Sequence, residues 1–466
     1  MVLCAGLFLI GLDVTVLNVA LPLIQHELRP TPQGLLWIAD AYTLALAGTV
    51  LAAGTWSDRH GRRRAFHLGL TLCGAASLSG ALSSAPGQLI TARLVMGLGA
   101  ALLMPSTLSL ITVVFPQERA RRRAIAVWTL VAALGALAGP PVGGLLIEHF
   151  SWRAGFWINL PVVVIALAGS WRWLPEARRT RRGPACRAGL TAATAALLTL
   201  VWSIIEAPAR GWSDPVVVGG FILAIALLAV AAWSQTRTTT PILPMSVLRD
   251  ARFTASASAL ACMFFALFGS LLLLTLYLQT YLGYSPARTG LHLLPLAAAL
   301  GTGAGLSLLL TPRLGDRFPV TTGMLLTAAG FGFLIHTGPG SGYAPVLGFQ
   351  LVTGLGAGLA AAPATEAVIA AIPPGHAGTG AAVNDLVREV GGALGIAVLG
   401  TLLTSAPGHF LTGLHHAAWT AAATALTAAA IALRWLPSTP AGGGEDRDIV
   451  PRRPDQTAPR HSRTRT

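Results

Sequence analysis

Apolar residues form long stretches that recur from the first residues of the chain to about residue 436. Each stretch has about 20 residues, enough for an α-helix to cross the hydrocarbon core of a bilayer. A helix suits each stretch, because it satisfies its backbone N–H and C=O groups within itself. The pattern predicts about fourteen membrane-spanning helices, near residues 2–24, 35–55, 65–84, 88–112, 124–146, 154–174, 188–206, 215–234, 252–282, 288–311, 320–338, 343–372, 378–404 and 411–436.

Arginine is distributed unevenly among the short polar loops between these stretches. The predicted helices give one side of the membrane the arginine-rich runs at 59–64, 118–123, 176–182 and 249–252, and give the other side single arginines at positions 29, 153, 210 and 288. Arginine-rich loops are retained in the cytoplasm. Both termini are therefore predicted to be cytoplasmic, as an even number of helices requires, in a multi-pass membrane protein.

A weak internal repeat suggests that the chain is duplicated. The segments GTWSDRHGRRR (54–64) and LGDRFP (314–319) both place Asp-Arg just beyond the end of a predicted helix on the cytoplasmic side. Duplicated halves with a binding site between them are a common transporter architecture. We predict an all-α polytopic membrane protein with an N-terminal six-helix half at 1–174, a cytoplasmic linker and two extra helices at 175–249, a C-terminal six-helix half at 250–436 and a disordered cytoplasmic tail at 437–466.

The composition agrees with this pattern, since 53% of the residues are hydrophobic, 11% are charged and the mean hydropathy is +0.65. In soluble proteins about a quarter of the residues are charged. The net charge of +14 would also suit a nucleic-acid-binding protein. The arginines, however, lie in loops between apolar stretches, so no nucleic-acid partner is expected.

Patterns typical of enzymes and metalloproteins do not occur in the sequence. It contains no glycine-rich phosphate loop, no Ser-His-Asp arrangement in a loop and no metal-ligand spacing, and its four cysteines are scattered. We therefore expect no enzyme, no cofactor and no metal site. Because no nucleotide-binding domain is recognised, uphill transport would draw on an ion gradient.

Ionisable residues inside the apolar stretches are the first candidates for function, because a charge in the bilayer is costly. Asp13 lies about 17 Å along its predicted helix, near the membrane midplane. It is a candidate proton carrier, and the alternative is a structural hydrogen bond to a neighbouring helix. Arg93 needs an acidic partner, for which Asp13 and Asp40 are available. Protonation of that partner would break the pair, whereas a fixed pair would only lock the packing.

A second group of charges lies in the C-terminal half. Asp385 and Glu389 are four residues apart and share a helix face with Arg388 alongside. Local charge balance is the favoured interpretation of Asp385, whereas Glu366 and Glu389 join Asp13, Asp40 and Arg93 as candidates for proton coupling. The candidates for lining a substrate cavity are Asn18, Trp37, Tyr42, Phe264, Phe265 and Arg388.

The fifth predicted helix has an unusual spacing of small residues in LGALAGPPVGG (134–144). Gly135, Gly139 and Gly143 recur every four residues, a pattern that lets two helices approach closely. Pro140 and Pro141 should kink or rigidify this helix.

Several of these segments, in this order, resemble the signatures of the major facilitator superfamily, and specifically its fourteen-helix drug:proton antiporter (DHA2) family. The segment 54–64 is similar to the cytoplasmic loop signature, although Trp56 and Ser57 replace the usual Leu and Ala. The other similar segments are LDVTVLNVALP (12–22), LITARLVMGLGAAL (89–102), GALAGPPVGG (135–144), SWRAGFWINLP (151–161) and the stretch 363–400, which resembles methylenomycin-resistance-type and other actinobacterial antibiotic exporters. The signature residues concerned are Gly54, Asp58, Arg59, Gly61, Arg62 and Arg63 in the loop, and Gly135, Gly139, Pro140, Gly143 and Gly144 in the antiporter helix.

The resemblance implies alternating access around a central cavity, with Asp58 and the following arginines latching the halves on the cytoplasmic side. It implies that Arg93 takes part in proton coupling and that the Gly139–Pro140 region sets the direction of export. The expected function is a proton-coupled antiporter that exports small drug-like or antibiotic molecules, with a small-molecule substrate, protons and the lipid bilayer as partners and a monomer as the working unit. The alternatives are a secondary exporter of one metabolite and a non-transporting receptor or scaffold of the same fold.

Overall fold

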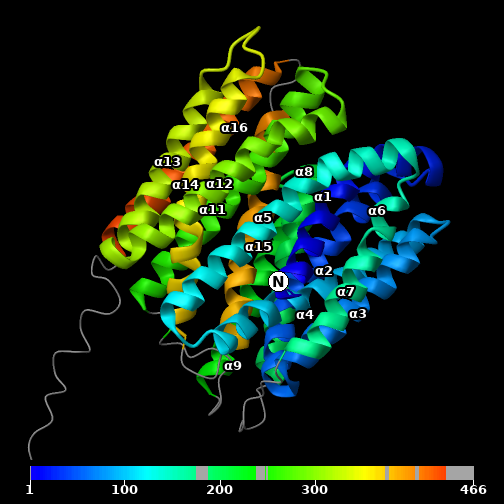
Figure 1. Cartoon of the computed structure of the whole chain (residues 1–466). Coiled ribbons are helices and arrows are strands. Elements are labelled where there is room, and N and C mark those ends of the chain that lie inside the picture. Colours follow the sequence, from blue (N-terminus) through cyan, green and yellow to red (C-terminus); the bar gives the residue numbers. More distant parts are fainter. Residues whose placement is uncertain are drawn as a thin grey trace, which may run out of the picture.

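The computed structural model describes residues 2–174, 187–237, 247, 250–372, 377–404 and 409–436. The predicted tail at 437–466 and residues 175–186 of the predicted linker lie outside this part of the chain. Within the described residues the protein is helical and contains no strand. The helices are α1 (Val2–Leu28), α2 (Pro32–His60), α3 (Arg62–Ala81), α4 (Pro86–Val114), α5 (Glu118–His149), α6 (Ala154–Trp157), α7 (Asn159–Trp173), α8 (Arg187–Arg210), α9 (Pro215–Thr236), α11 (Ala251–Leu276), the π-helix η1 (Tyr277–Tyr281), α12 (Pro286–Leu314), α13 (Arg317–Ile335), α14 (Ala344–Ala370), α15 (Ala377–Thr404) and α16 (Phe410–Trp435) (Figure 1).

These helices coincide with the predicted membrane spans, with α6 and α7 sharing the sixth span and α11 and η1 sharing the ninth. Eleven helical segments of the described chain, 19 to 31 residues long, are apolar enough to cross a membrane. The remaining long helices, α1, α3 and α5, have 27, 20 and 32 residues and pack into the same bundle. The predicted all-helical membrane fold is confirmed.

Three helices begin with the same local chemistry. Thr31, Asp214 and Ser285 each cap a helix by accepting a hydrogen bond from a backbone N–H of its first turn, and a proline follows each cap. Such caps satisfy N–H groups that lack a partner in the helix, and proline suits the first helical position. The sequence therefore marks sharply where α2, α9 and α12 begin.

Helix packing repeats between the two ends of the chain. In the first bundle (α1–α7), α1 packs on α5 and α7, α4 packs on α2 and α3, and α3 packs on α7. In the second bundle (α11–α16), α11 packs on α15 and α16, α14 packs on α12 and α13, and α13 packs on α16. The two sets are equivalent when α11 is matched to α1 and each following span in turn, which agrees with the predicted pair of six-helix halves (Figure 1).

The bundles meet along a zone that we call the seam. Here α5 of the first bundle packs on α12 of the second, and α2 packs on α15, so that the same two positions in each bundle make the contact. The extra helix α8 packs on both α2 and α15, and α9 packs on α8. Trp212, between α8 and α9, donates from Nε1 to Thr401 Oγ1 of α15 at 3.1 Å. The central helix pair therefore lies across one side of the seam.

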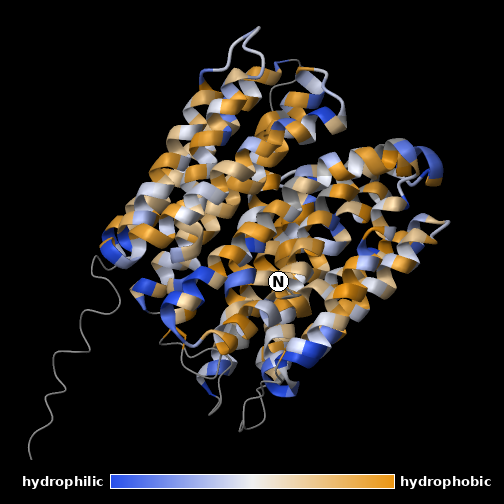
Figure 2. Cartoon of the chain, viewed as in Figure 1, coloured by the Kyte–Doolittle hydropathy of each residue, from blue (hydrophilic) through white to orange (hydrophobic). Residues whose placement is uncertain are grey.

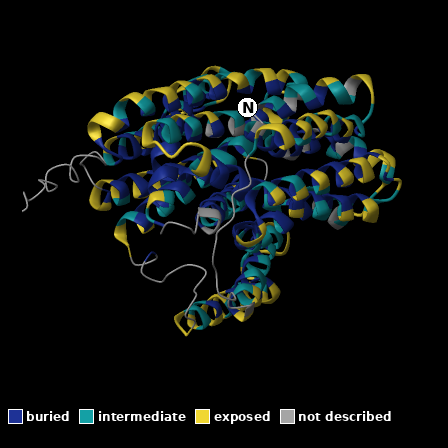
Figure 3. Ribbon diagram, turned by 60° about the horizontal axis from the view of Figure 1, so that its bottom comes forward, coloured by how far each residue is buried: buried dark blue, intermediate teal, exposed yellow. Residues whose placement is uncertain are grey.

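Burial and hydropathy follow this arrangement. Figure 3 shows buried residues toward the middle of the molecule and exposed residues on its outside. Helix α9 is the most exposed of the apolar spans, since only 22% of its most hydrophobic stretch is buried. In Figure 2 the helix bodies are largely hydrophobic, while hydrophilic residues gather at helix ends, notably at the bottom of the view. We call this the arginine-rich end, because the turns between α2 and α3, α4 and α5, and α12 and α13 lie there and are flanked by arginines.

The predicted loop at 54–64 is mostly helical, so that prediction is wrong in its extent. Helix α2 continues to His60 and α3 begins at Arg62, which leaves Gly61, at φ +111°, to make the turn. Asp58 therefore lies inside α2, whereas Asp316 follows Gly315, which has φ +73°. The equivalent positions in the two turns are therefore Gly61 and Gly315. Both turns need a positive φ, which residues other than glycine adopt at a cost.

Candidate functional site

An ion pair joins two helices in the interior of the first bundle. Arg93 of α4 donates from Nη1 to Oδ2 of Asp13 of α1. The two side chains are only 1% and 5% exposed, respectively. Of the two acidic partners available to Arg93 in the sequence, the structure thus pairs it with Asp13.

The second oxygen of Asp13 is also bonded. Asn159, at the start of α7, donates from Nδ2 to Asp13 Oδ1 at 3.1 Å and to Ser77 Oγ of α3 at 2.9 Å. Ser77 Oγ in turn donates to the carbonyl of Phe156 at 2.9 Å. The Asp13 carboxylate is therefore the centre of a network that links α1, α3, α4 and α7.

Arg93 has further partners in α2. Its Nε donates to the carbonyl of Ile38 at 3.3 Å, and its guanidinium carbon lies 4.6 Å from the centre of the Tyr42 ring. Such a cation–π contact is attractive, and more so when it is desolvated. The hydroxyl of Tyr42 is buried without a partner. Asp40, also in α2, is half-buried and lies within electrostatic range of Arg93.

Each buried charge of this pair compensates the other. Removing one partner of a buried ion pair costs about 3–5 kcal/mol, because the other charge is left uncompensated. A proton on Asp13 removes its charge and with it the attraction to Arg93. Each side chain then retains partners of its own, with Asp13 beside Asn159 and Arg93 beside Ile38 and Tyr42.

A second cluster of charges lies at the seam. The guanidinium carbon of Arg388, in α15, lies 4.5 Å from the ring centre of Phe264 in α11 and 4.9 Å from that of Trp128 in α5. It therefore lies between a ring of each bundle. Arg388 Nη1 is 3.8 Å from Oδ1 of Asp385, and Asn384 Nδ2 donates to that same oxygen at 3.3 Å.

Several buried polar atoms of this seam cluster lack a partner among the described residues, namely Asp385 Oδ2, Asn384 Oδ1 and Arg388 Nε. Buried polar groups are nearly always bonded in native proteins, so three in one short segment need an explanation. Glu389, the next residue of α15, and Phe265 of α11 are half-buried. A ligand at the seam cluster could therefore bond to a carboxylate oxygen, an amide oxygen and an N–H group. The N–H group belongs to the guanidinium that contacts the two aromatic rings.

A third set of charges connects the bundles at the arginine-rich end. Arg121 Nε of α5 donates to Oε1 of Glu366 of α14 at 2.8 Å, and Arg122 Nη1 donates to Oδ1 of Asp316 at 3.3 Å. Both carboxylates are 4% exposed. We call these four residues the latch. Arg252 of α11 adds a bond from Nη2 to Asp316 Oδ2 at 2.9 Å.

The electrostatics of the latch favour its charged form. Burial lowers the pKa of Arg122, but Asp316, Glu118 and Glu366 outweigh this effect, so its pKa is raised above the usual value. The structure places Glu366, a candidate for proton coupling, in this latch rather than beside Asp13. Glu366 Oε2 is buried without a partner.

The residues of the loop signature lie within the first bundle. Arg62 Nη2 is 3.5 Å from Asp58 Oδ1, Arg62 Nη1 donates to the carbonyl of Ser109 at 3.3 Å, and Arg63 Nη2 donates to that of Trp171 at 2.8 Å. Gly54 is buried in α2 and Arg59 is exposed. These contacts of Arg62 and Arg63 fasten α2 and α3 to α4 and α7, whereas the ion pairs between bundles come from Arg121 and Arg122.

The small residues of α5 lie against two neighbours. A Cβ added at Gly135 would lie 2.6 Å from the carbonyl oxygen of Phe8, and one at Gly143 would lie 3.2 Å from Cα of Val16, both in α1. At Gly144 it would lie 3.2 Å from Cα of Ala287 in α12. Glycine therefore lets α5 approach α1 on one side and the second bundle on the other.

The remaining predicted residues are less informative. The helix continues through 140–141, Gly139 is buried, and the side chains of Pro140 and Asn18 lie outside the described part of the chain. Trp37 is half-buried in α2 beside Ile38.

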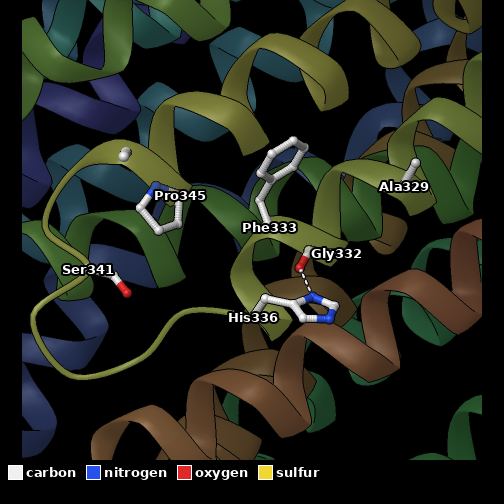
Figure 4. A pocket seen from close by; sticks show the side chains of 7 residues that line it. Ala329, Gly332, Phe333, His336, Ser341 and Pro345 are labelled. Atoms are coloured by element: carbon white, nitrogen blue, oxygen red, sulfur yellow. Dashed lines mark hydrogen bonds between the residues drawn. The ribbon is translucent and has the colours of Figure 1, made fainter.

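An open pocket of about 690 Å³ lies away from all three charge clusters. It is formed where α13 ends and α14 begins, and His336, whose Nδ1 is 2.7 Å from the carbonyl oxygen of Gly332, lies at its edge (Figure 4). The pocket holds no ion pair, and it lies at the end of α13 opposite the latch. We therefore place the candidate site at the charge clusters.

Sequence reasoning missed several residues of these clusters. It assigned no role to Ser77, Trp128 or Asn159, and it used Arg121 and Arg122 only to orient the loops. Their signal was weak, because the partners are far apart in the sequence and the side chains are common in membrane helices. Only the arginine run that opens α5 could have drawn attention to the latch.

Comparison with known proteins identifies similar chains. The sequence profile of the Major Facilitator Superfamily matches residues 3–396 and 257–459. The chain is 33% identical over 400 residues to "Multidrug resistance protein Stp" of Mycobacterium tuberculosis (strain CDC 1551 / Oshkosh), covering 86% of this chain and 74% of that one. It is 37% identical over 415 residues to "Puromycin resistance protein pur8" of Streptomyces alboniger, covering 88% and 82% of the two chains.

Two further similarities agree with these. The chain is 34% identical to "Methylenomycin A resistance protein" of Streptomyces coelicolor (strain ATCC BAA-471 / A3(2) / M145), covering 86% of this chain and 85% of that one. The crystal structure of the human organic anion transporter MFSD10 (TETRAN) matches with a TM-score of 0.65 and 19% identity, covering 92% of this chain and 98% of that one. At this identity the structural likeness shows the fold alone.

Proposed function

The chain belongs to the Major Facilitator Superfamily, and from this premise we propose that it exports drug-like or antibiotic molecules in exchange for protons. It is a multi-span membrane transporter of small molecules and not an enzyme. Relatives named for resistance to puromycin, to methylenomycin A and to multiple drugs support export of such molecules. The observation that carries the proton-coupled part is the buried pair of Asp13 and Arg93.

The proposed proton step uses this pair as a switch. Asp13 ionised attracts Arg93 and holds α1 to α4. Asp13 protonated releases Arg93, which stays with α2 through Ile38 and Tyr42. One proton therefore changes how firmly α1 is held within the first bundle.

The proposed route from this switch to the opening of the transporter runs through α5. Helix α1 packs on α5 at Gly135 and Gly143, where α5 has no side chain that could absorb a shift. The same helix α5 carries Arg121 and Arg122 of the latch at its other end. A displacement of α1 would therefore move α5 and loosen the latch, which exposes the seam at the arginine-rich end.

The proposed drug site is the seam cluster around Arg388. Its unpaired carboxylate oxygen suits a cationic or hydrogen-bond-donating group, and the rings of Trp128 and Phe264 suit an apolar or planar body. Because the cluster takes side chains from both bundles, it is rebuilt when the bundles rock. Binding and release would follow from that movement.

Orientation and assembly complete the proposal. Arginine-rich loops remain cytoplasmic, so the latch is placed at the cytoplasmic end, with both termini inside, in the bacterial cytoplasmic membrane. The chain carries both bundles and hence the whole seam, which supports a monomer as the working unit. The boundaries at 1–174, 175–249 and 250–436 are proposed as its structural divisions.

Transport in inverted membrane vesicles tests the proposal. Energised vesicles that contain the protein should accumulate compounds from a drug panel, and a proton ionophore should abolish the accumulation. Accumulation that survives the ionophore would contradict proton coupling. Accumulation of one metabolite but none of the drugs would favour a metabolite exporter of the same fold.

A further inference from the structure

We propose that Asn159 is a positioning residue for the proton step, holding Asp13 when it is ionised and accepting its hydrogen bond when it is protonated. This inference rests on the proposed proton-coupled export. It assigns to α7 a part in coupling beyond that of Asp13 and Arg93. The support is the geometry of a buried amide whose two ends have very different surroundings.

The nitrogen end of the amide is fully used. Asn159 has no exposed surface. Its Nδ2 donates to Asp13 Oδ1 at 3.1 Å and to Ser77 Oγ at 2.9 Å, which uses both of its hydrogens. Ser77 Oγ donates to the carbonyl of Phe156. This arrangement suits an ionised Asp13, which accepts hydrogen bonds and donates none.

The oxygen end of the amide has no partner. Asn159 Oδ1 is buried and makes no hydrogen bond within the described structure. An unpaired buried acceptor is unfavourable, and such atoms in native proteins often mark a functional requirement. Because Oδ1 is unbonded, rotation of the amide by a half-turn breaks no bond at that end.

Rotation of the amide keeps its bonds to Asp13 and Ser77 with their direction reversed, and it releases the bond from Ser77 to Phe156. When a proton binds Asp13, the carboxyl group gains an O–H that donates. With Oδ1 now facing Asp13, the Asn159 oxygen accepts from that O–H. The Ser77 hydroxyl rotates from the Phe156 carbonyl and donates to Oδ1 as well. The proton stays on Asp13 throughout, and the amide exchanges no proton.

Of the two side chains that donate to Asp13 in the described structure, Arg93 and Asn159, only Asn159 also carries an acceptor. The ionisable groups that face it are Arg93 of α4, Tyr42 of α2 and Cys73 of α3, and Asp40 of α2 acts on Arg93. Arg93 only donates, and Cys73 Sγ points to the carbonyl of Met96 at 3.6 Å. Helix α5 meets α1 through glycines, and α6 (residues 154–157, AGFW) contains no ionisable residue.

A packing role for Asn159 predicts something different. In that case the amide would only fasten α7 to α3, and its loss would lower the amount or stability of the protein. The pH dependence of transport would then stay as in the wild type. The shape of the pH profile therefore separates the two roles.

The test is proton-driven efflux in inverted vesicles, measured from about pH 5.5 to pH 8.5 around neutrality, with equal amounts of transporter. Asn159→Leu keeps the approximate volume and removes both hydrogen-bonding ends. The bond that Asn159 donates to the ionised carboxylate is charge-assisted and is the stronger of its two bonds to Asp13. Losing both bonds should therefore raise the half-maximal pH by about one unit, equivalent to a tenfold gain in proton affinity. Ser170→Ala removes a buried hydroxyl further along α7, which donates to the carbonyl of Leu167 in the same helix; it is the matched control and should keep the wild-type midpoint. Asn159→Gln retains an amide, so its midpoint should lie closer to the wild-type value than that of Asn159→Leu.

Each outcome decides the matter. A wild-type midpoint in Asn159→Leu, with normal or reduced protein, would overturn the inference and leave the proposed function intact. Wild-type efflux that ignores the proton ionophore would overturn both. If Asn159→Leu does not reach the membrane, Asn159→Ala adds no bulk and takes its place, with the same two outcomes.

Discussion

The carboxyl groups of Asp13 and Asp385 are both buried beside an arginine, yet their surroundings differ. Asp13 has each oxygen bonded, one to Arg93 and one to Asn159, and all three side chains belong to the first bundle. Asp385 has one oxygen without a partner, and its arginine lies between a ring of each bundle. The carboxylate of Asp13 is therefore fully bonded, whereas that of Asp385 is not.

This difference separates the two tasks of an exchanger. A carboxylate whose two oxygens are both bonded inside one bundle has no oxygen left for a drug, but a proton can change it by removing its charge. A site at the seam with unused polar atoms offers bonds to a ligand and is altered when the bundles rock. We therefore assign the proton to the Asp13 network and the drug to the seam cluster. The latch, through α5, connects them.

Removal of the charge of Asp13 should have the largest effect. Asp13→Asn leaves Arg93 buried without a counter-charge and leaves no group to titrate. Since breaking such a pair costs about 3–5 kcal/mol, efflux should fall about a hundredfold or more, measured in vesicles with matched transporter content. Asp385→Asn is the paired variant and should keep its proton dependence. Normal proton-driven efflux by Asp13→Asn would break the comparison.

Reversal of a charge in the latch should have the next largest effect. Arg121→Glu places a second carboxylate beside buried Glu366 and should lower efflux about tenfold, because like charges repel at low dielectric. The exchange of both residues, Arg121→Glu with Glu366→Arg, should recover most of the loss. Arg119→Glu makes the same charge change at an exposed position of the same turn and serves as the control. An equal loss of efflux in Arg119→Glu and Arg121→Glu would show that the latch has no role in transport.

Replacement of the planar cation at the seam should change drug affinity more than coupling. Arg388→Lys keeps a positive charge near Asp385 but loses the stacked guanidinium between Trp128 and Phe264. With cation–π contacts worth about 0.5–2 kcal/mol, KM should rise roughly three- to tenfold for planar drugs while the pH midpoint stays unchanged. A shifted pH midpoint with an unchanged KM would instead assign the proton, and not the drug, to the seam cluster.

Widening of the α1–α5 contact should have the smallest effect on efflux. A Cβ at Gly143 meets Val16 at 3.2 Å, so Gly143→Ala pushes the helices apart by a few tenths of an ångström. Efflux should fall by up to about fivefold, as overpacking of about 1 kcal/mol would cause. Gly219→Ala on α9 meets nothing within 4 Å and is the matched control. Thermal unfolding of both variants shows whether stability alone explains the loss. An unaffected Gly143→Ala would show that coupling does not depend on this close contact.

Most of the fold was predictable from the sequence, and the reason is physical. Apolar length and arginine distribution report directly on membrane crossing, and each predicted span coincides with a helix. Helix ends were less predictable, because the polar residues around Asp58 and Arg62 look like a loop although α2 and α3 run up to Gly61 on either side. A polar helix end and a loop have the same composition at a membrane surface.

The candidate site was predictable in its residues but not in its partners. The cost of burying charge singles out Asp13 and Arg93 whatever the fold. The choice between Asp13 and Asp40, and the contact of Arg121 with Glu366 across 245 residues of chain, depend on how helices pack. Asn159 has no charge, so its role becomes visible only when its bonded and unbonded ends are seen.

Proton release on drug binding tests the central claim most directly. Purified transporter in weakly buffered detergent solution, with a pH indicator, receives a saturating dose of a drug identified in the vesicle panel. The account predicts that the wild type and Asp385→Asn release protons and that Asp13→Asn releases none. Release that persists in Asp13→Asn and disappears in Asp385→Asn would contradict the assignment of the proton to the first bundle.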